Sequence, residues 1–134
     1  MSEEVKVIGI DTNILVRIIT RDDEKQSQIA LDYVSNSSTP FVINHIVISE
    51  LVWVLESAYK YDKKQIIKAL ECILKVKQFL ILEKNSVRSA LKLYAETSID
   101  FSDALIGYVN KEEGCEFTIT FDKATSKTSI YKLL

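Results

Sequence analysis

The chain is poor in the residues that build disulfide frameworks, zinc sites and flexible linkers. Its 134 residues include two Cys, one His, three Gly and one Pro. Cys72 and Cys115 are too few and too isolated for a disulfide framework or a zinc site, and Cys72 lies in an amphipathic helical pattern that predicts a reduced core thiol. Scarce Gly and Pro, without a linker, low-complexity segment or internal repeat, predict short connections. We therefore expect a single domain over residues 1–134.

The sequence also lacks a strong charge excess and a long apolar run. A formal net charge of −2 argues against a generally basic nucleic-acid-binding surface. It leaves a nuclease open, because metal ions in an acidic pocket present positive charge to phosphates. There is no apolar run of about 18 residues that would cross a membrane, and the N-terminal MSEEVKV lacks the basic and apolar regions of a signal peptide. We expect a cytoplasmic protein that does not associate with a membrane.

Short apolar runs of strand length alternate with helical patterns. The runs are rich in Val, Ile and Phe and do not alternate with polar residues, which is typical of parallel strands buried on both faces. The expected strands are Val5–Ile10, Phe41–Ile43, Phe79–Leu82, Phe117–Thr120 and, at an edge, Ile130–Leu133. The expected helices are a first stretch after Asp11, then Asp22–Ser35, Ile46–Tyr59, Asp62–Val76, Ser86–Glu96 and Ser102–Glu113, with Gly114 at the C-terminal cap. This alternation predicts an α/β three-layer sandwich with a central parallel sheet of four to five strands flanked by helices.

Acidic residues interrupt the most apolar stretches. VKVIGI runs into Asp11, ISELVWVL carries Glu50, DFSDALIGYV carries Asp103, and FTITF runs into Asp122. Buried ionised acids are tolerated mainly when a positive group neutralises them. Sites in open parallel sheets form beyond the carboxyl ends of the strands, so Asp11 and Asp122 would converge if the first and fourth strands are neighbours. We expect one site that holds a divalent cation through oxygen ligands.

Each acid has a structural explanation as well. Asp11 suits the N-cap of a helix, and Asp122 suits a turn. Asp100 and Asp103 open a helix, where the dipole favours negative charge. Glu50 is harder to explain in this way, because its helix is apolar almost all round and leaves little room for a solvated face. One shared site accounts for all these acids with a single assumption.

The motifs IGIDTNILVR, ISELVWVLE, DFSDALIGY and TITFDK, in this order, resemble those of the PIN domain, and most closely VapC-like toxins of bacterial and archaeal toxin–antitoxin pairs. The resemblance covers essentially the whole chain. It implies a ribonuclease dependent on Mg²⁺ or Mn²⁺, often a homodimer, often held inactive by a cognate antitoxin protein. The family's acidic quartet is matched by Asp11, Glu50, Asp103 and Asp122, its supporting polar residues by Asn13 and Thr120, and its accessory acid by Asp100.

The chemistry of RNA hydrolysis suits these residues. Cleaving a phosphodiester requires a deprotonated water and charge stabilisation at the phosphate and the leaving oxygen, which divalent cations supply. We expect Asp11 and Asp103 to bind the metal directly, joined by Asp122. Glu50 would hold a water at the metal or accept its proton. Asn13 and Thr120 would orient these oxygens by hydrogen bonding.

Other polar and aromatic residues are weaker candidates for catalysis or RNA binding. His45 fits a helix entry better than a general base, and no Ser is paired with a His and an acid as a catalytic triad requires. Trp53 and Tyr59 are spaced as helix core rather than as a base-stacking platform. The candidate phosphate contacts, for which a solvated rim is an equal explanation, are Arg17, Arg21, Lys123 and Lys127.

Two other classes of function remain open on the sequence. A non-catalytic PIN-type scaffold would bind RNA or protein, although an intact acidic quartet would then have no chemical purpose. A receiver-like phosphoacceptor module needs an Asp directly after a middle strand, which neither FVIN nor FLILEK offers. An apolar surface for a dimer or an antitoxin is expected around Ile29, Leu31, Val34 and the helix 62–76.

Overall fold

The computed structural model describes residues 6–134, which divide into two compact units. Unit 1 ends at Leu82, and unit 2 is Glu83–Leu134. Val5, the expected start of the first strand, lies outside the described residues. Within residues 6–134, no helix is long and apolar enough to span a membrane.

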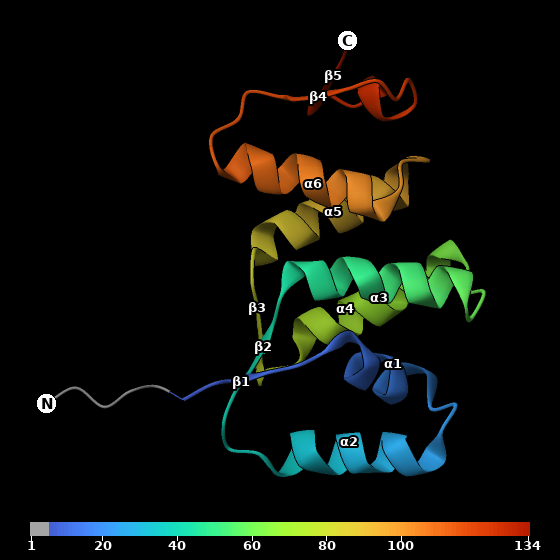
Figure 1. Cartoon of the computed structure of the whole chain (residues 1–134), viewed down its shortest axis with the longest axis vertical. Helices are drawn as coiled ribbons and strands as arrows, with labels where there is room; N and C mark the ends of the chain where they lie inside the picture. Colours follow the sequence, from blue (N-terminus) through green and yellow to red (C-terminus); the bar gives the residue numbers. More distant parts are fainter. Residues whose placement is uncertain (1–5) are drawn as a thin grey trace, which may run out of the picture. The chain divides into compact units, whose positions relative to one another are not determined.

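Unit 1 is built around a three-stranded parallel sheet (Figure 1). Its strands β1 (Ile8–Gly9), β2 (Phe41–Ile43) and β3 (Phe79–Ile81) lie in the order β1-β2-β3. Phe41 and Ile43 of the middle strand are buried, whereas Leu80 of β3 is 45% exposed. The expected burial on both faces therefore fails for β3.

Four helices complete unit 1, and each begins at a polar side chain that accepts a hydrogen bond from a backbone N–H of the first turn. Such caps satisfy donors that the helix itself leaves unpaired. The helices are α1 (Thr12–Thr20), α2 (Glu24–Asn36), α3 (His45–Ser57) and α4 (Lys63–Lys75). Their caps are Asp11, Asp23, Asn44 and Asp62, the last forming a capping box with Gln65.

Unit 2 pairs two helices with a short two-stranded sheet (Figure 1). Helices α5 (Lys84–Glu96) and α6 (Phe101–Glu112) pack together, with the rings of Tyr94 and Phe101 edge to face at 6.0 Å between centroids. Strands β4 (Thr118–Thr120) and β5 (Tyr131–Leu133) are parallel, and the 3₁₀ turn Thr125–Lys127 connects them. Gly114, at φ 95°, follows the end of α6 as expected.

The expected order of strands and helices is confirmed, but the single sheet of four to five strands is not. The described residues form one sheet of three strands and one of two. Two expectations of burial are also wrong. Cys72 is exposed, because α4 buries Ile66, Leu70 and Ile73 on the opposite side, and Trp53 on α3 is 67% exposed.

At Gly107, α6 packs closely against the segment that leads into β5. A Cβ at this position would lie 2.5 Å from Ile130 Cδ1 and 3.0 Å from Tyr131 Cε2. Alanine favours a helix over glycine by about 1 kcal/mol, but overpacking costs about 1–3 kcal/mol. We expect Gly107→Ala to lower the free energy of unfolding in urea by about 1 kcal/mol net.

The control for Gly107→Ala removes the clashing atom. Ile130→Val deletes Cδ1, so the double variant Gly107→Ala/Ile130→Val should lose less stability than the sum of the two single losses. Additive losses would contradict the close approach of α6 to Ile130.

Candidate acidic site

Asp11 and Glu50 are linked in unit 1 through one buried residue, Thr12. Asp11 follows β1 and caps α1, its Oδ1 accepting a hydrogen bond from Thr12 N at 2.8 Å. The Thr12 side chain is buried, and its Oγ1 donates to Glu50 Oε1 on α3 at 3.3 Å. The N-cap role considered for Asp11 is confirmed. It leaves the second carboxylate oxygen of Asp11 available to other partners.

Glu50 lies on a solvent-exposed stripe of α3. Ile46 and Trp53, four residues before and three residues after it, are 60% and 67% exposed. This spacing places all three on one side of the helix. The expectation that α3 has no solvated face was therefore wrong, because an apolar helix face can remain uncovered. The Glu50 carboxylate is exposed on this stripe.

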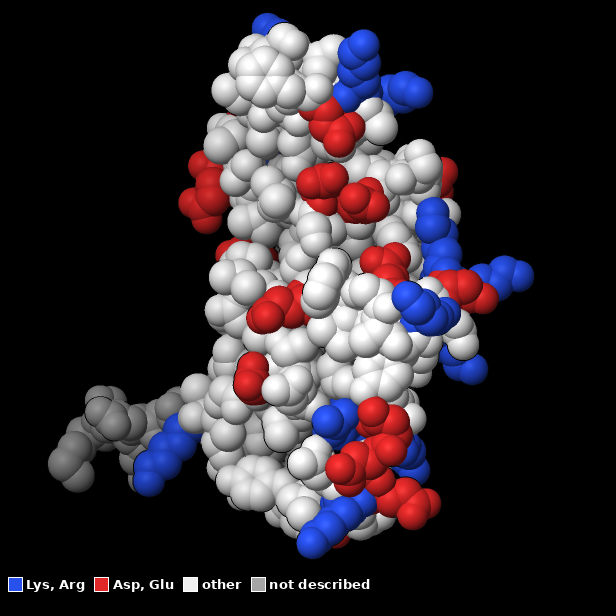
Figure 2. All heavy atoms as spheres, turned by 45° about the vertical axis from the view of Figure 1, so that its right-hand side comes forward, with Lys and Arg blue, Asp and Glu red and all other residues white. Residues whose placement is uncertain are grey.

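Two carboxylates of unit 2, Asp100 and Asp122, act on a third, Asp103, near the start of α6. Asp100 is the N-cap residue, without a side-chain capping bond, and Asp103 lies in the first turn. Partial burial, followed by repulsion from Asp100 and then Asp122, raises the pKa of Asp103. Figure 2 shows acidic side chains gathered on one face of unit 2, with basic side chains at its upper end. The ionised form of Asp103 is therefore disfavoured.

A tight turn holds Asp122 in its ionised form. Its Oδ1 accepts a hydrogen bond from Thr125 N at 3.0 Å, and its own backbone N–H donates to Thr120 Oγ1 at 3.0 Å. The backbone N–H groups of Thr125 and then Ala124 lower the pKa of Asp122. The turn role considered for Asp122 is confirmed.

Two neutral hydroxyls near Asp103 were missed by sequence reasoning. Thr125 is 4% exposed, and its Oγ1 lies 3.5 Å from Asp103 Oδ2, at the limit of a hydrogen bond. Its spacing three residues after Asp122 is that of a capping turn and was a usable signal. The Tyr131 hydroxyl donates to the Asp103 carbonyl at 2.7 Å, and burial with the Asp103 charge raises the pKa of Tyr131 to about 12. No local pattern could have revealed Tyr131.

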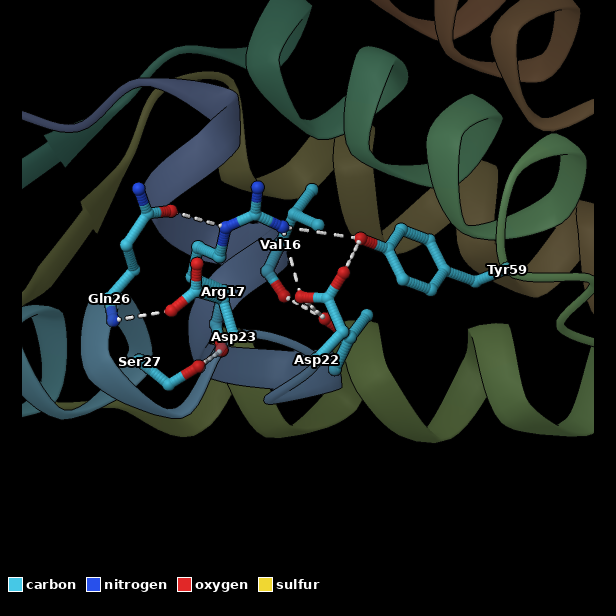
Figure 3. Close-up of polar contacts among 8 residues, drawn as sticks. Val16, Arg17, Asp22, Asp23, Gln26, Ser27 and Tyr59 are labelled. Atoms are coloured by element: carbon cyan, nitrogen blue, oxygen red, sulfur yellow. Dashed lines mark hydrogen bonds and ion pairs between the residues drawn. The ribbon is translucent and has the colours of Figure 1, made fainter.

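The remaining candidates occupy different settings. Asn13 is exposed in the first turn of α1, and His45 begins α3, as expected for a helix entry. Arg17 is held by Gln26 and Asp22 in unit 1 (Figure 3). The other candidate phosphate contacts are exposed: Arg21 at the C-cap of α1, and Lys123 and Lys127 around the 3₁₀ turn of unit 2.

The donor set fits Mg²⁺ or Mn²⁺ by its chemistry. All donors are oxygens, which hard cations prefer. A cation would also relieve the repulsion that raises the pKa of Asp103. Across residues 6–134, no three His, Cys, Asp or Glu side chains already stand at ligand distance from one point. Electrostatic repulsion acts over a longer range than coordination, so Asp100 and Asp122 raise the pKa of Asp103 without the three forming a closed cage.

The opposite pKa shifts of Asp103 and Asp122 predict opposite effects on stability in metal-free protein. A raised pKa means that ionised Asp103 destabilises the fold above its pKa, and this cost disappears as the pH falls. The lowered pKa of Asp122 means stabilisation at neutral pH that is lost on acidification. Asp103→Asn should raise the Tm at pH 7 and Asp122→Asn should lower it, with both differences shrinking in acid. Shifts of the same sign would contradict this electrostatic picture.

Comparisons with known proteins agree with these motifs. The family model described as "PIN domain" matches residues 8–130, which run through both units. A curated protein of Aquifex aeolicus (strain VF5), "VapC ribonuclease", is 28% identical over 120 residues, covering 88% of this chain and 89% of that protein. The family match extends well beyond half of the chain and includes every acid of the expected quartet. The chain therefore belongs to the PIN domain family.

Proposed function

We propose that this chain is a metal-dependent endoribonuclease of the VapC type, a single functional PIN-like domain acting in the cytoplasm. The observation that carries the proposal is the match of the PIN domain model over residues 8–130, a range that contains all four acids of the quartet. The raised pKa of Asp103, caused by burial and then by repulsion from Asp100 and Asp122, supports it. A structural acid has no need of such repulsion, whereas a cation site does. The VapC ribonuclease that it resembles supports RNA as the substrate.

In this proposal, the acidic quartet that matches the family motifs binds the metal ion. Asp11 and Asp103 bind Mg²⁺ or Mn²⁺ directly, joined by Asp122. A divalent cation supplies a water of lowered pKa and neutralises the phosphate charge. Glu50, exposed and hydrogen-bonded by Thr12, accepts the proton of the attacking water. Asp100 adds negative charge beside Asp103 and strengthens cation binding.

Neutral hydroxyls and backbone groups then orient these acids without competing for the cation. Thr120 fixes the backbone of Asp122, and Thr125 approaches Asp103 from the same turn. Asn13, in the first turn of α1, orients the acids of unit 1. Lys123 and Lys127 around the 3₁₀ turn contact RNA phosphates, as does Arg21. A net charge of −2 makes such local cations more important than any general attraction to RNA.

Removing one acid should abolish cleavage while leaving the fold intact. We expect Asp11→Asn, Glu50→Gln and Asp103→Asn each to lower the rate of RNA cleavage by about 100-fold or more. The assay uses purified protein, a pool of structured RNAs and Mg²⁺ or Mn²⁺, and EDTA should give the same loss. Asp32→Asn, an exposed acid on α2, is the matched control and should cleave as the wild type does.

Two results would contradict the proposed function. Cleavage retained by two of the three acid variants would overturn the site. Folded wild-type protein that binds no Mn²⁺ and cuts no RNA in the pool would favour a non-catalytic scaffold instead.

We further propose that a cognate antitoxin protein docks on unit 1. Helices α1, α2 and α4 enclose an apolar groove of about 820 Å³ that includes Leu31 and Val34, within the surface expected from sequence. Ile29 lines a different groove, between α2 and the β1 edge. An apolar groove of this size suits the apolar face of a partner helix. A homodimer through the same groove is the competing occupant.

A charge placed in the groove should release the antitoxin. Ala69 on α4 lines the groove and is partly exposed, so Ala69→Glu should fold. We expect the product of a reading frame adjacent to this gene, when co-expressed, to copurify with wild type and block cleavage, but not with Ala69→Glu. Lys64→Glu, outside the groove, is the control. Light scattering of the chain alone tests the homodimer, since Ala69→Glu would then halve the molar mass.

A further inference from the structure

The guanidinium of Arg17 joins four segments of unit 1. Its Nε donates to Gln26 Oε1 at 2.7 Å, and its Nη1 donates to Asp22 Oδ1 at 2.9 Å and to the Tyr59 hydroxyl at 3.3 Å. The Tyr59 hydroxyl in turn donates to Asp22 Oδ2 at 2.5 Å (Figure 3). Thr20 also donates to Asp22 Oδ1 at 3.1 Å. The end of α1, the loop after it, the first turn of α2 and the segment after α3 are thereby tied together.

At least two polar links join α1 to the α3 region, and this network is one of them. The first is the hydrogen bond from Thr12 to Glu50, at the end of α1 that carries Asp11. The second joins Arg17, near the other end of α1, to Tyr59, two residues beyond the last residue of α3. Between the links α1 and α3 pack together. Two separated links fix both the translation and the rotation of one helix against the other, which a single link cannot do.

We propose that Arg17, Asp22 and Tyr59 form a positioning clamp that holds α1 in register with α3, so that Asp11 and Glu50 keep the geometry required for metal binding. The inference rests on the proposed function and deepens it. Arg17 is thereby assigned to the internal geometry of unit 1 rather than to RNA phosphate. Asp22 and Tyr59 are positioning residues that act on Asp11 and Glu50 through the packing of α1 against α3.

The chemistry of the three side chains suits a geometric role better than a stabilising one. The Arg17 and Asp22 side chains are 31% and 41% exposed, and an ion pair this exposed adds little to stability. The planar fork of Arg17 nevertheless fixes two directions at once, toward Gln26 and toward Asp22, which a lysine ammonium does not. The hydrogen bond from Tyr59 is the main cause that lowers the pKa of Asp22, so the pair remains charged at neutral pH.

The test compares clamp variants with matched controls on other surfaces. Tyr59→Phe removes only the linking hydroxyl, and Arg17→Lys keeps the charge but loses the fork. Tyr33→Phe and Arg88→Lys make the same chemical changes at exposed positions outside the clamp and the acidic site. Two quantities are measured at fixed pH: the ¹³C shift of the Glu50 carboxyl carbon in metal-free protein, and the affinity for Mn²⁺ by paramagnetic resonance.

We expect both clamp variants to move the Glu50 carboxyl signal and to weaken Mn²⁺ binding by about tenfold, the lower end of the loss seen for groups that orient metal ligands. Both control variants should match the wild type. Thr12→Val breaks the first link, so adding Tyr59→Phe to it should cost less than the two separate losses combined. Arg17→Lys should fail to restore wild-type affinity although its charge is kept.

Each outcome decides one of the two proposals. A lowered Tm with an unchanged Glu50 signal and unchanged Mn²⁺ affinity would overturn the clamp, as would full activity in Arg17→Lys. Weaker RNA binding with unchanged Mn²⁺ affinity in Arg17 variants would make Arg17 a phosphate contact instead. If the wild type binds no Mn²⁺ and cuts no RNA, the proposed function fails, and the Glu50 signal alone still decides the clamp. Asp22→Asn replaces Tyr59→Phe if the latter does not fold.

Discussion

The cost of holding the Asp103 carboxylate, partly buried and beside two other acids, is the constraint on which the acidic surface of unit 2 depends. Like charges brought together raise one another's pKa and oppose folding unless they are held and their charge is matched. Asp103 bears this cost most clearly, with burial, Asp100 and Asp122 all raising its pKa. Neutral hydroxyl groups lie near Asp103. The Thr125 hydroxyl approaches the Asp103 carboxylate, and the Tyr131 hydroxyl donates a hydrogen bond to the Asp103 carbonyl. Neutral donors hold a carboxylate in place without neutralising its negative charge, which therefore stays available to a cation.

Neutral donors also hold the acids of unit 1. Glu50 receives its hydrogen bond from the Thr12 hydroxyl, and Asp11 from a backbone N–H, so neither acid is neutralised by a basic side chain in these bonds. The ion pair of unit 1 that ties segments together lies elsewhere, between Arg17 and Asp22 at the far end of α1. The basic side chain of Arg17 therefore holds helices together away from Asp11 and Glu50, whereas a hydroxyl and a backbone amide hold these two acids. This division suits a site that must accept a metal ion.

Local sequence patterns predicted most elements and the acids, because strand and helix periodicity and capping preferences act over a few residues. They failed where the outcome depends on which face a distant segment covers. The helix α3 reads as buried all round, yet its stripe of Ile46, Glu50 and Trp53 is exposed. The expectation that Cys72 on α4 is buried was wrong for the same reason. Periodicity identifies the faces of a helix, but packing decides which face meets solvent.

By itself, the sequence determined the order of the elements, the parallel character of the strands and the family, since these follow from local apolar patterns and from motifs that run through residues 8–130. Only the tertiary structure decided the pairing of the strands into sheets of three and two. It also decided which hydroxyls meet which acids. Thr125 reaches Asp103 across 22 residues, and Arg17 reaches Tyr59 across 42. Contacts over such separations depend on how whole elements pack, and no local pattern encodes that.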